Sequence, residues 1–437
     1  MNLKLGCIAD DFTGATDLAN NLVRAGMRVV QTMGLPSGAL HTEADAVVIA
    51  LKTRTVAPAD AVAQSLDALR WLQQQGATQI YFKYCSTFDS WYQGDVRGNI
   101  GPVTEALMAE LGTDFTIATP AFPDNGRTVF KGHLFVGDVL LSDSGMKDHP
   151  LTPMRDASLV RVMQAQCQGR VGLIDHRAVG ASSAAVRQQI AHLRTQGVRI
   201  AVVDAVSNDD LMRLGPALAD LPLVTAGSGV AIGLPANWGL KANPRTSGLP
   251  ASRGRRAIVS GSCSQATLGQ VRHFIDRGLP HWAIDPLHLV DDAGHRAAVA
   301  QALGFAREHP ERPVLICSSA TPDAVRAIQQ RMGSQQAGER VEQALAAVAR
   351  GLIEQGVRQL IVAGGETSGA CVQALGITQM QIGPQIDPGV PWCHASAPLS
   401  PEGLHIALKS GNFGGVDFFT RSFDLLQAPA HDRNPSP

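Results

Sequence analysis

Charged residues are scarce in this sequence, and neither sign is in excess. They make up 17% of the 437 residues, against about 25% in an average globular protein. The 37 Lys and Arg residues nearly balance the 38 Asp and Glu residues. This balance excludes a broad basic surface and argues against nucleic acid as a main partner. With so few charges, we expect some outer surface to be buried against another subunit, as in a homodimer.

Long apolar runs and paired cysteine motifs are also missing. No segment approaches the ~20 consecutive apolar residues that a membrane-spanning helix needs. The short apolar stretch at 3–9 runs into two aspartates, which is unlike a signal peptide. The seven cysteines are scattered without a C-x-x-C motif, as expected of reduced thiols in the cytosol. These absences predict a cytoplasmic protein that does not contact a membrane.

Apolar runs of strand length alternate with amphipathic, helix-like stretches. In the first half the expected strands are Leu3–Ala9, Ala46–Leu51, Thr78–Tyr84, Phe115–Thr119, Val171–Asp175, Ile200–Ala205 and Leu223–Ala226. The alternation restarts later, with expected strands at Ala257–Ser260, Val314–Ser318, Leu360–Ala363 and near 405–409. This pattern is typical of an α/β fold with a mostly parallel sheet.

A stretch rich in glycine and proline separates the two halves. Residues 233–254 hold four glycines and three prolines and show no apolar period, which is typical of a linker. We therefore predict two domains, at 1–232 and 255–427, each a mostly parallel sheet flanked by helices, with the active site in the cleft between them. The last ten residues, 428–437, contain three prolines and are expected to be disordered.

The first expected strand ends in two neighbouring carboxylates, Asp10 and Asp11, which precede Thr13 and Gly14. In open α/β sheets, ligands bind beyond the carboxyl ends of the strands, so residues at these ends are the first candidates for a site. Two adjacent carboxylates can hold substrate hydroxyls, and one can act as a general base. Capping of the next helix explains one of them at most. We interpret Asp10 and Asp11 as candidate catalytic residues.

A lysine and a polar loop end another expected strand. Lys83 lies near the end of Thr78–Tyr84, and Ser86, Thr87 and Asp89 follow it. An ammonium group pairs with a carboxylate, while hydroxyl and carboxylate side chains bind hydroxyl groups. The loop is therefore a candidate site for a small polyhydroxy acid. The alternative is a lysine at a sheet edge beside an ordinary polar loop.

Two arginines, Arg127 and Arg155, follow turn-forming residues. A guanidinium group binds a carboxylate through two parallel hydrogen bonds, so both are further candidates for substrate binding. A surface charge is the alternative for each, since arginine is common in this chain.

Three expected strands of the second half end in loops rich in glycine and serine. The loop residues that are candidates for nucleotide contact are Ser260, Ser262, Gly364, Gly365, Glu366, Thr367, Lys409 and Gly411. Glycine lets a phosphate approach the backbone, and the start of a helix supplies N–H donors. Glu366 can hold Mg²⁺ directly or through water. A tight turn explains any one loop alone, but three in one domain predict a nucleotide site.

Two familiar nucleotide motifs do not account for these loops. No G-x-x-x-x-G-K-[ST] motif occurs, which excludes a Walker-type NTPase. Residues 227–233 read G-x-G-x-x-x-G, one residue longer than the dinucleotide fingerprint, and run into the predicted linker. A nicotinamide-dependent sugar-acid dehydrogenase therefore remains an alternative, as does a sensor that closes on a sugar acid without turnover.

Seven segments together resemble the four-carbon acid sugar kinases. They are Asp-Asp-Phe-Thr-Gly-Ala (10–15), Lys-Tyr-Cys-Ser-Thr-Phe-Asp-Ser (83–90), Pro-Ala-Phe-Pro-Asp-Asn-Gly-Arg-Thr-Val (120–129), Gly-Asp-Val-Leu-Leu (137–141), His-Pro-Leu-Thr-Pro-Met (149–154), Ala-Gly-Gly-Glu-Thr-Ser-Gly (363–369) and Leu-Lys-Ser-Gly-Asn-Phe-Gly (408–414). They occur in order across nearly the whole chain.

The resemblance implies an N-terminal domain that binds the sugar acid and a C-terminal domain that binds ATP. It implies transfer of the γ-phosphate to the C4 hydroxyl of a 3-oxo-tetronate, with Mg²⁺ on the triphosphate. Carried over by motif, nucleotide contacts fall at 260–262, at 364–367 and around Gly411. Substrate contacts fall at Asp10, Asp11, Lys83 and the 86–90 loop.

One segment departs from the family pattern. Trp-Tyr-Gln-Gly-Asp-Val-Arg at 91–97 is longer and bulkier than the resemblance leads one to expect, and it leaves the choice among four-carbon acids open. Threonate or erythronate 4-kinase activity is the alternative within the family.

Overall fold

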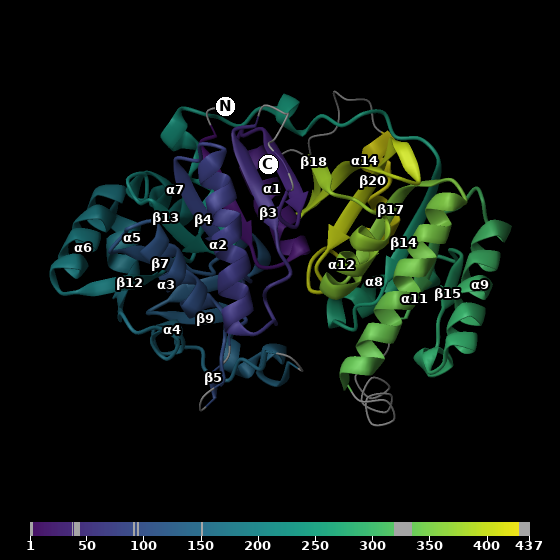
Figure 1. The fold of residues 1–437 in the computed structure, drawn as a ribbon, viewed down its shortest axis with the longest axis horizontal. Helices are drawn as coiled ribbons and strands as arrows, with labels where there is room; N and C mark the ends of the chain where they lie inside the picture. The colour runs from purple at the N-terminus through teal and green to yellow at the C-terminus, as the bar shows by residue number, and fades with distance from the viewer. Residues whose placement is uncertain are drawn as a thin grey trace. The chain divides into compact units, whose positions relative to one another are not determined.

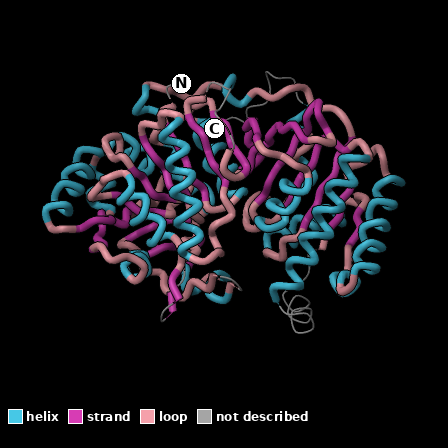
Figure 2. Tube along the Cα trace, in the orientation of Figure 1, coloured by secondary structure: helices cyan, strands magenta, loops and turns pink. Residues whose placement is uncertain are grey.

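The computed structural model divides the chain into two compact units, Met1–Thr246 and Ser247–Pro437 (Figure 1). It describes residues 3–36, 38, 44–90, 92–93, 96–149, 152–318 and 334–427. The boundary falls within 233–254, where the sequence predicts a linker, and the predicted tail at 428–437 lies outside the described residues. Strands and helices alternate in both units (Figure 2).

A parallel sheet forms the centre of the N-terminal unit. Its strands lie in the order β11 (Arg170–Ile174), β12 (Val198–Val203), β7 (Thr116–Thr119), β13 (Leu223–Ala226), β4 (Gln79–Lys83), β1 (Leu5–Ala9), β3 (Ala46–Ala50) and β2 (Val29–Met33). All seven strands expected from the sequence are present. β2 was not predicted, because Gln31 and Thr32 interrupt its apolar run.

Helices cover the faces of this sheet (Figure 1), which is why its strands read as nearly continuous apolar runs. They are α1 (Phe12–Arg24), α2 (Pro58–Gln74), α3 (Ile100–Glu110), α4 (Leu159–Gln164), α5 (His176–Ala181), α6 (Ser183–Thr195) and α7 (Asn208–Ala217). Capping side chains begin several of them. Asp11 accepts a hydrogen bond from the backbone N–H of Gly14, and Ser207 and Asp210 form a capping box at α7.

An antiparallel meander interrupts the alternation of parallel strands and helices in this unit. It comprises β8 (Arg127–Phe130), β9 (His133–Val136) and β10 (Val139–Leu140). Asp204, directly after β12, holds the β8–β9 turn. Its carboxylate accepts hydrogen bonds from the backbone N–H groups of Lys131 and Gly132, each at 2.8 Å, and of His176 at 3.0 Å. Asp204 thus connects the strand carrying Arg127 to the parallel sheet.

The C-terminal unit combines a parallel sheet with an antiparallel extension. Its strands lie in the order β18 (Gln379–Asp387), β19 (Val390–Ala397), β20 (Ser400–Lys409), β17 (Val357–Ala363), β14 (Arg255–Ser260), β16 (Val314–Cys317) and β15 (His281–Ala283). Pairing is parallel from β20 to β15 and antiparallel from β18 to β20. The sequence indicated β14, β16, β17 and the end of β20, but not β15, β18 or β19.

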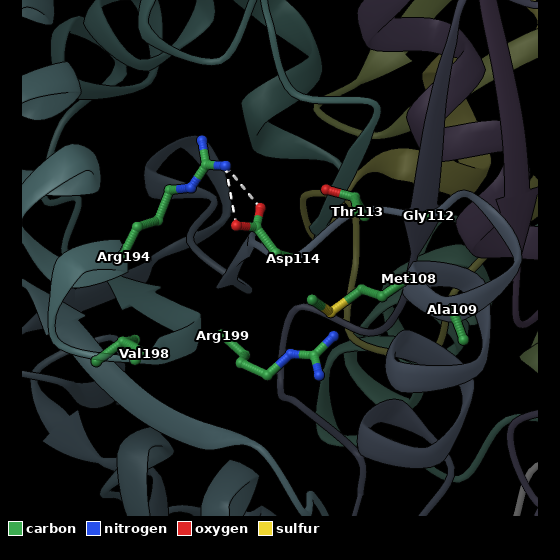
Figure 3. A pocket seen from close by; sticks show the side chains of 9 residues that line it. Met108, Ala109, Gly112, Thr113, Asp114, Arg194, Val198 and Arg199 are labelled. Carbon is green, nitrogen blue, oxygen red and sulfur yellow. Dashed lines mark hydrogen bonds and ion pairs between the residues drawn. The ribbon is translucent and has the colours of Figure 1, made fainter.

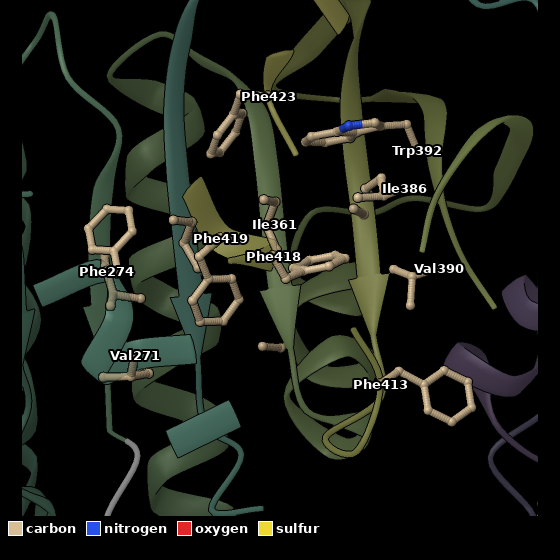
Figure 4. Close-up of a cluster of buried hydrophobic side chains, with 14 of the residues drawn as sticks. Val271, Phe274, Ile361, Ile386, Val390, Trp392, Phe413, Phe418, Phe419 and Phe423 are labelled. Carbon is tan, nitrogen blue, oxygen red and sulfur yellow. The ribbon is translucent and has the colours of Figure 1, made fainter. Parts of the chain in front are cut away.

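The helices of this unit are α8 (Gln265–Asp276), α9 (Asp292–Glu308), α11 (Ser334–Glu354), α12 (Gly365–Ala374), α13 (Phe418–Arg421) and α14 (Asp424–Gln427). Aromatic side chains fill the core between β19 and the C-terminal helices (Figure 4). The indole N–H of Trp392 donates to the backbone oxygen of Ser422 at 2.8 Å. The antiparallel extension is therefore part of the buried core.

Within the part of the chain that the structure describes, no helix is long and apolar enough to cross a bilayer.

We expect Asp204→Ala to lower the free energy of unfolding by about 2–4 kcal/mol, because three N–H groups lose their acceptor together. Urea denaturation measures this loss. Asp114→Ala is the control, since Asp114 lies on the surface of the same unit and pairs with exposed Arg194. A loss no larger than that of Asp114→Ala would contradict the role given to Asp204.

Candidate functional site

The N-terminal site lies at the carboxyl ends of three neighbouring strands. β1 pairs in parallel with β3 and with β4, so that Ala9 lies beside Ala50 and Lys83. The residues that follow these strands therefore come together, although they are far apart in sequence. The predicted Asp10, Asp11 and Lys83 meet here.

Arg54 joins this group and binds both aspartates. Its Nε and Nη2 donate to the two oxygens of Asp10, each at 2.9 Å, and Nη2 also donates to Oδ1 of Asp11 at 2.7 Å. The backbone N–H groups of Thr53 and Arg54 donate to the carbonyl of Asp10. One guanidinium group thus binds two adjacent carboxylates and fixes their orientation.

Lys83 approaches the start of α1 very closely. Its Nζ lies 3.7 Å from Oδ1 of Asp11, and only 4% of its side chain is exposed. A Cβ added to Gly14 would lie 1.8 Å from this Nζ. A side chain at Gly14 of the Asp-Asp-Phe-Thr-Gly-Ala segment would therefore displace the ammonium group of Lys83 or the carboxylate of Asp11.

The charges around Asp11 decide its protonation state. Burial alone would raise the pKa of Asp11, but Arg54, Lys83 and the hydrogen bonds from Thr13 and Gly14 outweigh it and lower the pKa. For Asp10, burial is the dominant effect and raises the pKa, although Arg54 opposes it. Asp11 is therefore held as a carboxylate, and each of its oxygens accepts at least one hydrogen bond.

The loop after β4 brings a further carboxylate to the group. Thr87 donates to Oδ1 of Asp89 at 2.6 Å, and Oδ2 of Asp89 lies 3.9 Å from Nη1 of Arg54. Between them Phe88 has a φ of 53°, which is uncommon for a residue other than glycine. Its ring is buried and packs edge-on against Tyr84 at 5.3 Å between centroids. Burial of this ring holds the loop in a conformation that directs Thr87 and Asp89 toward each other.

Arg54 and its support were missed from the sequence. Arg54 follows the strand at Ala46–Ala50, so the rule that selected Lys83 would have selected it as well. The Nδ2 of Asn99 donates to the carbonyls of Thr53, Arg54 and Val56, at 2.7, 3.2 and 3.0 Å. Asn99 therefore holds the loop that carries Arg54.

The remaining predicted substrate residues differ in their surroundings. Ser86 is buried in the loop after β4. Burial lowers the pKa of Arg127, and Cys85, Asp89 and Asp17 oppose this shift, so Arg127 lies within electrostatic range of the loop. Arg155 has an exposed side chain, with Asp148 as an ion-pair partner at 4.0 Å. Its role in substrate binding stays a prediction.

The three serine- and glycine-rich loops of the C-terminal unit meet at one edge of its sheet. The backbone N–H of Gly261 donates to Ala363, and that of Gly364 donates to Lys409. The hydroxyls of Ser264 and Thr267 both donate to the carbonyl of Gly411. The ends of β14, β17 and β20 are thus joined by hydrogen bonds beyond the sheet itself.

Glycine is required where these loops touch. A Cβ on Gly411 would lie 2.5 Å from Oγ of Ser262, and one on Gly261 would lie 2.3 Å from Oγ1 of Thr367. Gly364 has a φ of +121°, where a side chain is strained. The predicted Ser262, Gly364, Thr367 and Gly411 therefore lie together, with Ser260 buried beneath them at the end of β14. The start of α12 adds backbone N–H donors that suit an anion.

The buried side chain of Lys409 supports these loops. Its buried Nζ donates to Oγ1 of Thr267 at 3.0 Å and to the carbonyls of Ser410, Gly411 and Phe413 at 3.0–3.1 Å. Burial lowers the pKa of Lys409 to about 7, while Asp387 opposes the shift. The amine therefore binds backbone oxygens of its own loop.

The donor set at this edge fits a nucleotide with Mg²⁺. Hydroxyl groups, glycine backbone and a helix N-terminus bind phosphate oxygens, and Mg²⁺ on a nucleotide is held by phosphates with one or two carboxylates. Gly365 and Glu366, in the first turn of α12, are exposed. Among the described residues, no group of three or more His, Cys, Asp or Glu side chains is placed to hold a metal.

The surface pockets lie at the opposite, amino-terminal edges of the sheets. One is lined by Met108, Asp114, Arg194 and Arg199, and Arg194 pairs there with Asp114 at 2.7 Å (Figure 3). Another lies at the starts of β14 and β17, with Pro310 and Glu311 before β16. These two pockets do not coincide with the polar residues at the carboxyl edges.

The glycine pattern at 227–233 does not open a long helix. Gly229–Ile232 form a single 3₁₀ turn, followed by another at Pro235–Trp238. A dinucleotide fingerprint requires a helix whose N-terminus meets the pyrophosphate, and this segment does not provide one.

Matches to known protein families divide the chain into the same two parts. Residues 5–234 match a sugar-binding N-terminal domain, and residues 257–419 match a nucleotide-binding C-terminal domain. The chain is thus a two-domain protein with one sugar-binding and one nucleotide-binding domain. It belongs to the four-carbon acid sugar kinase family, as the sequence motifs predicted.

Relatives of known name match over nearly the full chain. The 3-oxo-tetronate kinase of Burkholderia multivorans is 56% identical over 430 residues, which is 98% of both chains. That of Cupriavidus necator is 56% identical and covers 97% of both chains. A solved structure from Salmonella typhimurium LT2 has a TM-score of 0.83 at 45% identity, covering 96% of this chain and 98% of its own. One from Haemophilus influenzae has a TM-score of 0.73 at 44% identity, covering 96% and 100%.

We expect Arg54→Met to lower the free energy of unfolding by about 3 kcal/mol at neutral pH, because two buried carboxylates lose their shared cation. The loss should shrink as the pH is lowered. The lowered pKa of Asp11 stabilises the folded state above its ordinary value of 3.8, and that stabilisation is lost as the pH falls through the lower folded value.

Urea denaturation at neutral and acidic pH measures both effects. Arg70→Met is the control, since Arg70 forms an exposed pair with Glu110 and should leave stability almost unchanged. Equal losses in the two variants would show that Arg54 is an ordinary surface charge.

We expect Lys409→Met to loosen the loop at 410–414, because three of its carbonyls lose a donor. Amide hydrogen exchange of this loop should become roughly tenfold faster, while the exchange of β14 stays slow. Lys147→Met is the control, because Lys147 is exposed in the other unit. Unchanged exchange at 410–414 would contradict a supporting role for Lys409.

Proposed function

We propose that this protein is an ATP-dependent 3-oxo-tetronate kinase that phosphorylates the C4 hydroxyl of its substrate. The observation that carries the proposal is the pair of polar edges: a carboxylate and cation cluster in the sugar-binding domain, and three joined glycine and serine loops in the nucleotide-binding domain. The first suits a small hydroxy acid, and the second suits a triphosphate. Relatives with 53–56% identity are named for this activity.

The N-terminal unit would hold the acid. Lys83, whose ammonium is buried beside Asp11, supplies positive charge for the substrate carboxylate, and Arg127 adds to it. Thr87 and Asp89 supply hydrogen-bonding groups for hydroxyls, together with Ser86. Because Arg54 fixes Asp10 and Asp11 before substrate arrives, these carboxylates can orient hydroxyl groups without a cost of rearrangement.

The C-terminal unit would hold the nucleotide. Gly364, Gly365 and the N–H groups at the start of α12 suit the phosphates, and the hydroxyls of Ser262 and Thr367 add donors. Glu366, together with the phosphates, would hold Mg²⁺, whose positive charge would offset that of the transferring phosphoryl group. Lys409 acts indirectly, because it keeps the carbonyls of Ser410, Gly411 and Phe413 in place.

Phosphoryl transfer depends mainly on positioning and charge neutralisation. The chain meets these requirements with groups that are already fixed: Arg54 by two carboxylates, Lys83 by Gly14 and Asp11, and the glycine loops by cross-strand hydrogen bonds. A homodimer and a cytoplasmic location stay predictions.

Release of ADP after addition of four-carbon acids to protein and Mg·ATP tests the activity. We expect 3-oxo-tetronate to be used with the highest kcat/KM, and threonate and erythronate to be used poorly. A preference for threonate or erythronate would reassign the substrate, and no ADP release with any of these acids would refute the kinase proposal.

Gly364→Ala tests the nucleotide site separately. The positive φ of Gly364 and the closeness of Thr367 should raise the KM for ATP by about tenfold or more, with little change in the KM for the acid. Gly356→Ala is a matched control, because Gly356 has a φ of +87° at the other end of β17 and an added Cβ would meet nothing within 4 Å. A rise in the KM for ATP in both variants would argue against a specific role of Gly364.

A further inference from the structure

A third carboxylate lies near the sugar-acid cluster, inside helix α1. Asp17 is 3% exposed and lies three residues after Gly14. Residues three apart on a helix share a face, and a Cβ on Gly14 would touch Nζ of Lys83. Asp17 therefore lies on the side of α1 that faces Lys83.

One carboxylate oxygen of Asp17 accepts a hydrogen bond, and the other has no described donor. Oδ2 accepts a hydrogen bond from the hydroxyl of Ser228, and Nδ2 of Asn21 donates to the carbonyl of Ser228. Among the residues that the structure describes, Oδ1 of Asp17 is buried without a hydrogen-bond donor. A buried polar atom without a partner costs about 1–3 kcal/mol, so it needs an explanation, such as a bound water, a ligand or a catalytic role.

In the other two carboxylates, Asp10 and Asp11, both oxygens accept a hydrogen bond. Both oxygens of Asp10 accept from Arg54. Asp11 accepts from Gly14 and Arg54 on Oδ1 and from Thr13 on Oδ2. A general base needs an oxygen that can receive a proton from the substrate. Of the three, only Asp17 has an oxygen without a described hydrogen-bond donor.

We propose that Asp17 belongs to the sugar-acid site and accepts the proton of the hydroxyl that is phosphorylated. The inference rests on the proposed kinase function. The substrate O–H bond breaks and its proton passes to Oδ1 of Asp17. The hydroxyl oxygen bonds to the γ-phosphorus of ATP, while the bond from that phosphorus to the bridging oxygen breaks and ADP leaves. Asp17 then returns its proton to solvent.

The electrostatic surroundings suit this role. Burial raises the pKa of Asp17 to about 7, and Lys83, the Ser228 hydroxyl and Arg127 oppose the shift, while Asp11 adds to it. Tyr81 of β4 also faces Asp17, and its own pKa is raised by burial, so it stays neutral. A base with a pKa near the working pH combines ready proton uptake with a useful ionised fraction.

The pH dependence follows directly. Asp17 accepts a proton only when ionised, so kcat should fall as the pH is lowered through about 7. We expect Asp17→Asn to lower kcat by about 100-fold or more and to remove this fall of kcat at low pH, the acidic limb of the pH profile. The KM values for the acid and for ATP should change by less than about threefold. Asp67→Asn, at an exposed position in α2, should keep the wild-type profile.

Ser228→Ala provides a second test in case Asp17→Asn does not fold. Loss of the hydroxyl donor should destabilise the ionised carboxylate and move the acidic limb of kcat to higher pH. A role of Asp17 in packing alone would not move this limb.

The proposal is overturned if folded Asp17→Asn keeps kcat within about threefold of the wild type, or if the limb stays in place in Ser228→Ala. Asp11→Asn distinguishes the carboxylates: if it abolishes the limb while Asp17→Asn keeps it, Asp11 is the base. Absence of ADP release in the wild-type protein would instead refute the kinase function itself.

Discussion

The ion pair between Arg54 and the two aspartates after β1 is the interaction on which the N-terminal site depends. Adjacent carboxylates at the end of a buried strand would repel each other and lose their hydration, so the fold must supply a cation at the same sheet edge. The parallel register of β1, β3 and β4 brings two cations to this edge: Arg54 after β3 and Lys83 at the end of β4. Gly14 and Asn99 support this arrangement. Gly14 leaves room for Lys83, and Asn99 holds the loop of Arg54.

The C-terminal unit handles charge in a different way. Its cation, Lys409, is turned toward backbone oxygens, and the surface left for a ligand consists of N–H groups, hydroxyls and glycine. Such a surface binds a triphosphate by directed hydrogen bonds, and a metal ion can supply the remaining charge. The two units thus use buried cations differently: Lys83 remains beside a carboxylate at the site, whereas Lys409 shapes the loop that forms it.

The sequence predicted the units, most strands and the candidate loops because these depend on local apolar runs and on the position of strand ends. It did not give strand order, and therefore did not show that the residue after β3 meets the residues after β1. β18 was missed because Gly383-Pro384 argues against a strand. Asp17 was missed because a polar residue inside a helix is ordinarily assigned to its solvent-facing side. Only the packing of α1 against Lys83 and Ser228 reveals that this position is buried.

Three cations at the two sites each have partners: Arg54 pairs with carboxylates, Lys83 lies beside Asp11, and Lys409 donates to carbonyl oxygens. A buried charge without such a partner would change its protonation state or destabilise the fold. Asp17 differs from these cations, because one of its oxygens has no described donor and burial raises its pKa to about 7. The proposed transfer of a proton to Asp17 would account for this oxygen.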